Sequence, residues 1–302
     1  MHGAMTANRT ATLALTAAGA LWGLTVPLSK LSLDWLGGGW LTVIRFALAA
    51  PVLAYAGRRG LRAACTPGIA TAGAIGFGAV ILLQNAGIAR TSVSHAALVV
   101  GAVPVLVALM AAGLGQGVAR PTAWAGYGLA LAGIALVAGS GGSGASAAGD
   151  LLVLGSVALS ATFVVVQPKL LAGRDPAAVT AVQFGAGALV ALPHAAVFEG
   201  LPPAPVAAAP VVAVVALALA GTLVPFWLFA HGQAHVSAGL AGAFLNLEPL
   251  VGVAVGWVGF GEAVAATQLL GGLAVLAGIA LSTMPARDRS RRGPRGLQPA
   301  AC

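Results

Sequence analysis

The sequence is poor in charged residues. Asp, Glu, Lys and Arg make up only 7% of its 302 positions, whereas soluble globular domains carry about 25%. Hydrophobic residues fill 59% of the positions. This composition excludes an ordinary soluble domain and predicts an integral membrane protein.

Aromatic residues and cysteines are also scarce. Aromatic residues account for 6% of the chain, and no basic stripe is interleaved with them to hold nucleic-acid bases. The formal net charge of +8 therefore does not indicate a nucleic-acid partner. Cys65 and Cys302 lack the spacing of metal ligands, so we expect no metal site, no disulfide and no cofactor.

Long apolar segments run through the whole chain. A membrane-spanning helix needs roughly 20 mainly apolar residues, and ten segments meet this requirement. They leave no room for a separate soluble domain, so the predicted fold is an all-α integral membrane protein with ten transmembrane helices. The expected spans are 11–31, 38–57, 69–89, 96–115, 122–140, 149–171, 177–198, 208–230, 238–260 and 267–284.

Lys and Arg are unevenly divided between the predicted loops and tails. With the N-terminus placed on the cytoplasmic side, the inner segments hold twelve of these residues and the outer segments hold two, Lys30 and Arg90. Short loops rich in Lys and Arg stay in the cytoplasm. We therefore expect a multi-pass protein of the cell membrane with both termini cytoplasmic.

The chain also contains an internal repeat. The segment LAGIAL occurs at 131–136 and again at 276–281, and at the same offset of 145 residues Pro104 matches Pro249. Nearer the start of each half the offset is 138, where Phe46 matches Phe184. We infer two five-helix units, 11–140 and 149–284, followed by a basic cytoplasmic tail, 285–302.

Because five is an odd number, the second unit crosses the membrane in the opposite sense to the first. Such inverted repeats place a site near the bilayer midplane that opens to each side in turn, and this symmetry favours transport. Pro104 and Pro249 break the fourth helix of each unit and free the carbonyls of Val100 and Leu245. Each break is either a structural kink or a substrate contact.

Several segments resemble a known family. The second unit reads LEPLVGVAVGWVGFGEAVAATQLLGGLAVLAGIAL over 247–281, and the first carries ALWGLTVPLSK, IRFALAA and ARTSVSHAALV in the same order as the family. These segments resemble the EamA repeat of the drug/metabolite transporter superfamily, and the resemblance covers nearly the whole chain. It implies a ten-helix carrier of small organic molecules, often an exporter of amino acids or related metabolites.

One family feature is present in only one of the two units. The Gly-Glu pair that commonly ends the fourth helix of each repeat is kept as Gly261 and Glu262, whereas the first unit has Gly115 and Gln116. We interpret Glu262 as an interfacial loop residue, because the end of this helix is in contact with water.

Two ionisable residues fall inside predicted spans. Charged groups at this depth are costly and are candidates for function. Glu248 lies near the midplane, and its equivalent in the first unit is Val103; Arg45 lies in the second span, and its equivalent is Gln183. Glu248 is either part of an ion pair, a group for proton coupling or a contact for a substrate amine, and Arg45 either pairs or extends toward the interface.

Other polar and aromatic residues are candidates for binding a solute. Trp227 and His231 lie four residues apart and share one face of the eighth span. The amides of the third, sixth and ninth spans either bind a solute or join helices. The complete set of candidate substrate-binding residues is Trp22, Gln84, Asn85, Gln167, Trp227, His231, Asn246 and Glu248.

These features favour a secondary transporter that works by alternating access on small metabolites, without catalytic residues. The sequence has no G-x-x-x-x-G-K-[ST] loop for ATP. An intramembrane enzyme and a non-transporting scaffold are the alternatives, but H-E-x-x-H and G-x-S-x-G motifs are absent. The first span carries no acidic residue, which disfavours the cationic-drug antiport of small multidrug exporters. The expected partners are a small-molecule substrate and the lipid bilayer, and proton coupling remains open.

Overall fold

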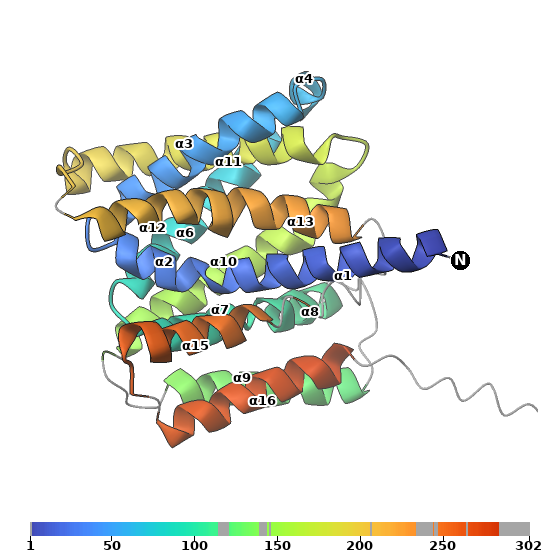
Figure 1. Cartoon of the computed structure of the whole chain (residues 1–302), viewed down its shortest axis with the longest axis vertical. Coiled ribbons are helices and arrows are strands. Elements are labelled where there is room, and N and C mark those ends of the chain that lie inside the picture. Colours follow the sequence, from blue (N-terminus) through green and yellow to red (C-terminus); the bar gives the residue numbers. More distant parts are fainter. Residues whose placement is uncertain are drawn as a thin grey trace, which may run out of the picture.

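The computed structural model describes residues 2–113, 121–138, 146–205, 207–233, 247–263 and 265–283, together with residues 144 and 244. These residues form helices joined by short connections, and they contain no strand (Figure 1). The prediction of an all-α fold is therefore confirmed for the described part of the chain.

Six segments of the described chain are long and apolar enough to cross a membrane. Two of them lie in a single helix without a change of helix type, namely α3 (Gly38–Ala56) and α10 (Ala147–Leu171). Each of the other four combines two or three consecutive helical elements. The six are Thr10–Ser32 in α1 (His2–Gly23) and α2 (Thr25–Ser32); Gly38–Ala56, which is α3; Pro67–Ile88 in α5 (Pro67–Gly73), η1 (Ala74–Ala79) and α6 (Val80–Ile88); Ala147–Gln167 in α10 (Ala147–Leu171); Pro176–Glu199 in α11 (Pro176–His194) and η2 (Ala195–Glu199); and Ala208–Phe229 in α12 (Ala208–Ala218), η3 (Leu219–Leu223) and α13 (Val224–Gln233).

Four further apolar segments of the described chain are 10–17 residues long. They are Val93–Val107 in α7 (Val93–Val100) and α8 (Val103–Gly113), Pro121–Val137 in α9 (Pro121–Ala138), Leu247–Phe260, which is α15, and Ala266–Gly278 in α16 (Ala266–Thr283). The short α4 (Leu61–Ala64) lies in a connection between two spans. The count of ten transmembrane helices and their inverted repeat remain predictions.

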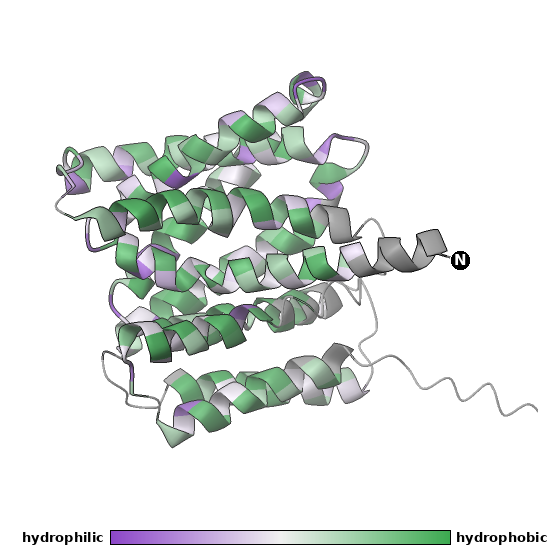
Figure 2. Cartoon of the chain, in the orientation of Figure 1, coloured by the Kyte–Doolittle hydropathy of each residue, from purple (hydrophilic) through white to green (hydrophobic). Residues whose placement is uncertain are grey.

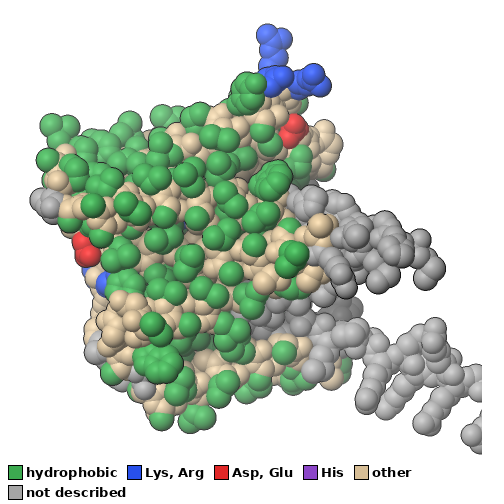
Figure 3. All heavy atoms as spheres, viewed as in Figure 1, with side chains coloured by type: hydrophobic (Ala, Val, Ile, Leu, Met, Phe, Trp, Pro, Cys, Tyr) green, Lys and Arg blue, Asp and Glu red, His purple; other side chains and the backbone are tan. Residues whose placement is uncertain are grey.

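The outer surface of the bundle is apolar along the helices and polar at their ends (Figure 2). Large hydrophobic side chains such as Leu189, Phe198 and Val258 are exposed, and hydrophobic side chains cover the face shown in Figure 3. Since monomeric soluble proteins rarely expose apolar patches of this extent, this surface matches lipid contact. The exposed Arg58 and Arg59 flank α4 at one end of the bundle.

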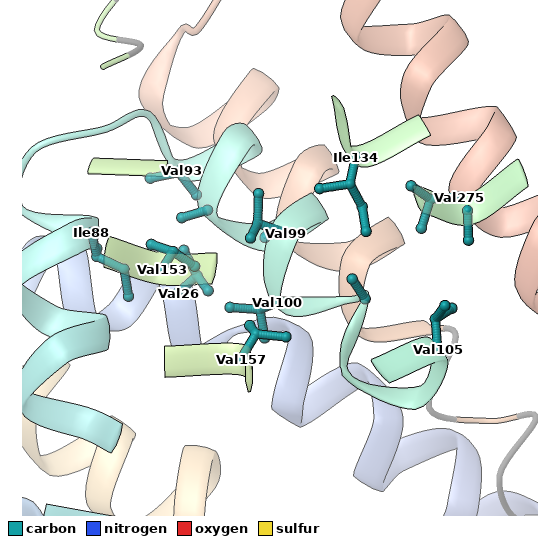
Figure 4. Close-up of a cluster of buried hydrophobic side chains, with 14 of the residues drawn as sticks. Val26, Ile88, Val93, Val99, Val100, Val105, Ile134, Val153, Val157 and Val275 are labelled. Atoms are coloured by element: carbon teal, nitrogen blue, oxygen red, sulfur yellow. The ribbon is translucent and has the colours of Figure 1, made fainter. Parts of the chain in front are cut away.

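The largest core cluster joins helices from both halves of the sequence. Valines and isoleucines from α2, α6, α7, α8, α9, α10 and α16 meet there (Figure 4). α9 and α16 pack through glycines, because an added Cβ at Gly133 would lie 2.6 Å from the carbonyl oxygen of Gly271. Small residues of this kind allow close helix contact in membranes.

Two π-helical turns interrupt the third and eighth spans. η1 begins at Ala74 and η3 begins at Leu219, so the two turns are separated by the repeat offset of 145 residues. Gly76 in η1 lies against the ring of Phe163, and Gly221 in η3 lies against Thr25. π-helical turns are rare, and those that occur are frequently found at functional sites. We therefore expect a functional site in the space between these two turns.

The fourth span is broken at Gly101 and Ala102, directly before Pro104, which lies in the first turn of α8. An added Cβ at Gly101 would lie 2.7 Å from Cβ of Pro249. The helix break in one half of the chain therefore contacts the proline of the other half.

Candidate functional site

A cavity of about 500 Å³ lies inside the bundle. Its walls come from α1 and α2, α3, η1 and α6, α7 and α8, α10, α11, η3 and α13, and α15. Both π-helical turns contribute residues to it. Most of its lining is apolar, and a few polar and charged side chains converge on it, as is typical of small-molecule sites.

Arg45 and Glu248 both line this cavity. The Arg45 guanidinium donates from Nε to Oγ1 of Thr222 at 2.6 Å and from Nη2 to the carbonyl oxygen of Gly221 at 3.4 Å, and it lies over the Phe46 ring. Because Arg45 is 8% exposed and held by η3, it does not extend to the membrane interface.

The Glu248 carboxylate makes no hydrogen bond or ion pair with the described residues, although its charge and that of Arg45 attract each other. Among the described residues, no Lys or Arg side chain lies within 4.0 Å of a carboxylate, and the one His contact of this kind joins His95 Nδ1 to Asp150 at 2.9 Å. The cavity therefore presents a cationic group and an anionic group that are not paired directly.

Aromatic rings form part of the lining. Trp22 packs edge-on against Phe226 and Phe229, with ring centroids 5.3 Å and 5.1 Å away. A neighbouring group of rings includes Phe77, which lies 5.0 Å from Phe163. Such rings provide rigid apolar contact area, and their faces attract cations.

The predicted amide residues have different roles in the structure. Gln84 and Gln167 line the cavity, and Gln167 also exchanges two hydrogen bonds with Gln183, at 3.0 Å and 2.8 Å. Asn85 is buried away from the cavity, where its Nδ2 donates to Gly38 O and to Thr42 Oγ1 at 3.2 Å each. Asn85 therefore joins α6 to α3.

The remaining predicted residues are not placed in the cavity. Trp227 is 67% exposed on the outer surface of α13. His231 lies on α13, but its side chain is outside the described residues, and Asn246 is also outside them. Pro249 is buried in the first turn of α15, next to Glu248.

Sixteen of the residues that line the cavity form eight pairs separated by one of the two repeat offsets. Each member of a pair occupies the equivalent position in its own half of the chain, yet few pairs have the same chemistry. At an offset of 138 residues the pairs are Trp22 and Ser160, Thr25 and Phe163, Val26 and Val164, and Ser29 and Gln167. At an offset of 145 residues they are Phe77 and Thr222, Ile81 and Phe226, Gln84 and Phe229, and Val103 and Glu248.

Sequence reasoning missed Thr222, Phe226 and Phe229, which line the cavity close to Arg45 and Trp22. These residues lie in an apolar span and carry no motif. The repeat contained the signal that would have found one of them, because moving Gln84 by 145 residues gives Phe229.

A second polar cluster lies at one end of the bundle, outside the cavity. Asp150 accepts a hydrogen bond from Thr91 Oγ1 at 2.6 Å and lies 2.9 Å from Nδ1 of His95. Glu262 accepts hydrogen bonds from the backbone N–H groups of Val93 and Ser94 at 2.5 Å and 2.9 Å. Glu262 therefore caps the N-terminus of α7, where a negative charge is favourable.

Comparisons with known proteins give the family of this chain. The model of the EamA-like transporter family matches residues 9–139 and 147–284. A protein of Streptantibioticus cattleyicolor named "Probable terminal-alkyne amino-acid exporter" is 30% identical over 279 residues, which cover 89% of this chain and 92% of that protein.

Two further similarities are more limited. An "Uncharacterized transporter" of Archaeoglobus fulgidus is 38% identical over 68 residues, which cover 22% of this chain and 25% of that protein. A crystal structure with 21% sequence identity superposes with a TM-score of 0.67 and covers 91% of this chain and 96% of its own. That similarity concerns the fold alone.

Proposed function

The chain belongs to the EamA-like transporter family and is a membrane transporter rather than an enzyme, and on this premise we propose that it exports zwitterionic amino acids or related small metabolites. The observation that carries this proposal is the pair of opposite charges in one cavity, Arg45 and Glu248, without an ion pair between them.

An amino acid supplies the partner that each charge lacks. An arginine guanidinium binds a carboxylate through parallel hydrogen bonds, and a glutamate carboxylate binds an ammonium group. Since unpaired charges inside a membrane are costly, a substrate that is neutral overall but carries both charges satisfies Arg45 and Glu248 together. Trp22, Phe226 and Phe229 then provide an apolar surface for the rest of the substrate.

We further propose that the two family-matching segments form inverted five-helix repeats, 11–140 and 149–284. Their relative movement opens the cavity to each side of the membrane in turn. Three observations support this: the two matches to one family model, the paired cavity positions, and the contacts between helices. α6 packs on α10 just as α13 packs on α1, which is the relation expected when the third and eighth spans are equivalent.

The proposed orientation has both termini in the cytoplasm and the protein in the cell membrane. A cysteine introduced after Gly141 is expected to react with an impermeant thiol reagent added to whole cells, whereas Cys302 is expected to react only after the cells are opened. Labelling of Cys302 in intact cells contradicts this orientation.

The function is tested by flux through the purified chain in liposomes. We expect saturable exchange of radiolabelled leucine that empty liposomes do not show, without added ATP. A panel of amino acids then defines the preferred side chain, and an imposed pH gradient tests proton coupling. If no amino acid moves although the chain is folded and inserted, the proposal is wrong, and the result favours a non-transporting scaffold or a different cargo.

A further inference from the structure

The Arg45 guanidinium is held by a single π-helical turn. Thr222 is fully buried in η3, accepts the hydrogen bond from Arg45 Nε at 2.6 Å and donates from its own hydroxyl to the carbonyl oxygen of Leu217 at 2.9 Å. The second contact of Arg45, to the carbonyl oxygen of Gly221, comes from the same turn. Both contacts bind one edge of the guanidinium.

The other edge of the guanidinium is available to a ligand. Among the described residues, no group accepts a hydrogen bond from Nη1 of Arg45, and Arg45 lines the cavity. Because the guanidinium is planar and its donors have a fixed geometry, anchoring the Nε edge determines the direction in which the remaining donors point.

The equivalent turn in the other half holds no charged group. Phe77 of η1 occupies the position of Thr222, and Gln183, the equivalent of Arg45, is paired with Gln167. Among the described residues that line the cavity, Arg45 is therefore the one anchored cation, and it gives a substrate carboxylate one place to bind.

Building on the proposed function, we propose that Thr222 is a positioning residue: it orients Arg45 so that a substrate α-carboxylate binds the Nη1 edge of the guanidinium, away from η3, with the amino group toward Glu248. Thr222 does not touch the substrate. Its effect is specific to the carboxylate, and this specificity separates positioning from a merely structural role.

The test compares Thr222→Val, which removes the hydroxyl and keeps the shape, with Thr222→Ser, which keeps the hydroxyl. Thr16→Val is the matched control, because the Thr16 side chain also donates to a carbonyl oxygen of its own helix, that of Thr12 at 2.9 Å, but is exposed and does not line the cavity. The probes are leucine and 3-methylbutylamine, which is leucine without its carboxylate. Binding to the detergent-solubilised full chain and exchange in liposomes are both measured.

For Thr222→Val we expect leucine affinity to fall and KM to rise about tenfold, the loss of one charge-assisted hydrogen bond, with a smaller change in kcat. The inhibition constant of 3-methylbutylamine is expected to stay unchanged. Thr222→Ser is expected to restore leucine binding, and Thr16→Val is expected to match the wild type.

The proposal is overturned if Thr222→Val weakens leucine and the amine equally, if Thr222→Ser does not restore leucine binding, or if the wild type binds no leucine. A wild type that binds leucine and does not transport it contradicts the proposed function instead. In that case the change in dissociation constant between wild type and Thr222→Val, compared for leucine and for 3-methylbutylamine, decides whether Thr222 orients Arg45.

Discussion

The cavity has a charged wall and a neutral wall. The charged wall consists of the cavity residues of α1, α2, α3, η3, α13 and α15, and the neutral wall consists of those of η1, α6, α7, α8, α10 and α11. Arg45 and Glu248 belong to the charged wall, and their equivalents in the repeat, Gln183 and Val103, belong to the helices of the neutral wall.

The two walls agree in backbone and differ in chemistry. Both contain a π-helical turn at the same repeat position, and the equivalent Phe46 and Phe184 are in ring contact with centroids 4.7 Å apart. The features that the two halves share, the π-helical turn and the equivalent phenylalanines, therefore belong to the helix packing of the bundle. Two charged residues that they do not share, Arg45 and Glu248, lie in the cavity, and we expect substitutions there to separate transport from stability.

The largest effect is expected from Arg45→Gln, because glutamine is the residue at the equivalent position of the neutral wall, Gln183. Loss of a carboxylate partner at a buried site costs about 2 kcal/mol, or about thirtyfold in affinity. Leucine exchange in liposomes measures this as a fall in kcat/KM. Arg45→Lys keeps the charge but loses the geometry of the guanidinium, so it is expected to rescue only in part. Full activity of Arg45→Gln would show that transport does not depend on the charge of Arg45.

Glu248→Gln is expected to have the next largest effect. Because Val103 occupies the equivalent position without an acid, we expect the variant to reach the membrane at normal levels. Its net transport is expected to fall about tenfold with a flatter dependence on pH, and substrate exchange is expected to change less if Glu248 carries protons.

Glu262→Gln provides the matched control for Glu248→Gln. Glu262 caps α7 outside the cavity, so its loss is expected to lower thermal stability and to leave the pH profile of flux unchanged. A Glu248→Gln protein with wild-type flux and pH profile would contradict the functional role of this acid, and a protein that fails to accumulate would make the role structural.

Two of the six tryptophans, Trp22 and Trp227, test the aromatic part of the charged wall. Trp22 contacts Phe226 and Phe229 at the cavity, whereas Trp227 is exposed on the outer surface. Trp22→Ala is expected to raise the KM for leucine roughly fivefold, and Trp227→Ala is expected to leave it unchanged. Equal effects of the two changes would show that neither acts through the cavity.

The sequence was sufficient for the family, the membrane class and the all-helical fold, because long apolar segments and a low share of charge are local properties of the chain. It also drew attention to Glu248 and Arg45, because charges are costly at such depth. The cavity wall was harder to predict, since only helix packing decides which side of an apolar span faces inward.

The eighth span illustrates this difficulty. The four-residue spacing of Trp227 and His231 marked one face of the helix as functional, whereas Phe226 and Phe229 face the cavity and Trp227 faces outward. Trp227 and His231 both follow the π-helical turn at Leu219–Leu223 and lie on α13, so their spacing places them on one face of this helix but does not show whether that face lies toward the cavity.

The smallest effect on transport is expected from the neutral wall, at the pair formed by Gln167 and Gln183. Each amide satisfies the other, and Gln183 is fully buried, so Gln167→Leu is expected to leave a buried amide without its partner and to lower stability by about 1 kcal/mol. Leucine exchange is expected to change less than about twofold, which corresponds to under about 0.4 kcal/mol.

A double-mutant cycle distinguishes this structural role from substrate binding by Gln167. If the pair only joins α10 to α11, Gln167→Leu combined with Gln183→Leu is expected to recover most of the thermal stability, because no unpaired amide remains. If Gln167 binds substrate, the double variant instead keeps the transport defect of the single one, with KM raised in both. Thermal unfolding and leucine KM measured on the same four proteins therefore decide whether the neutral wall is a scaffold for the charged one or a second half of the binding site.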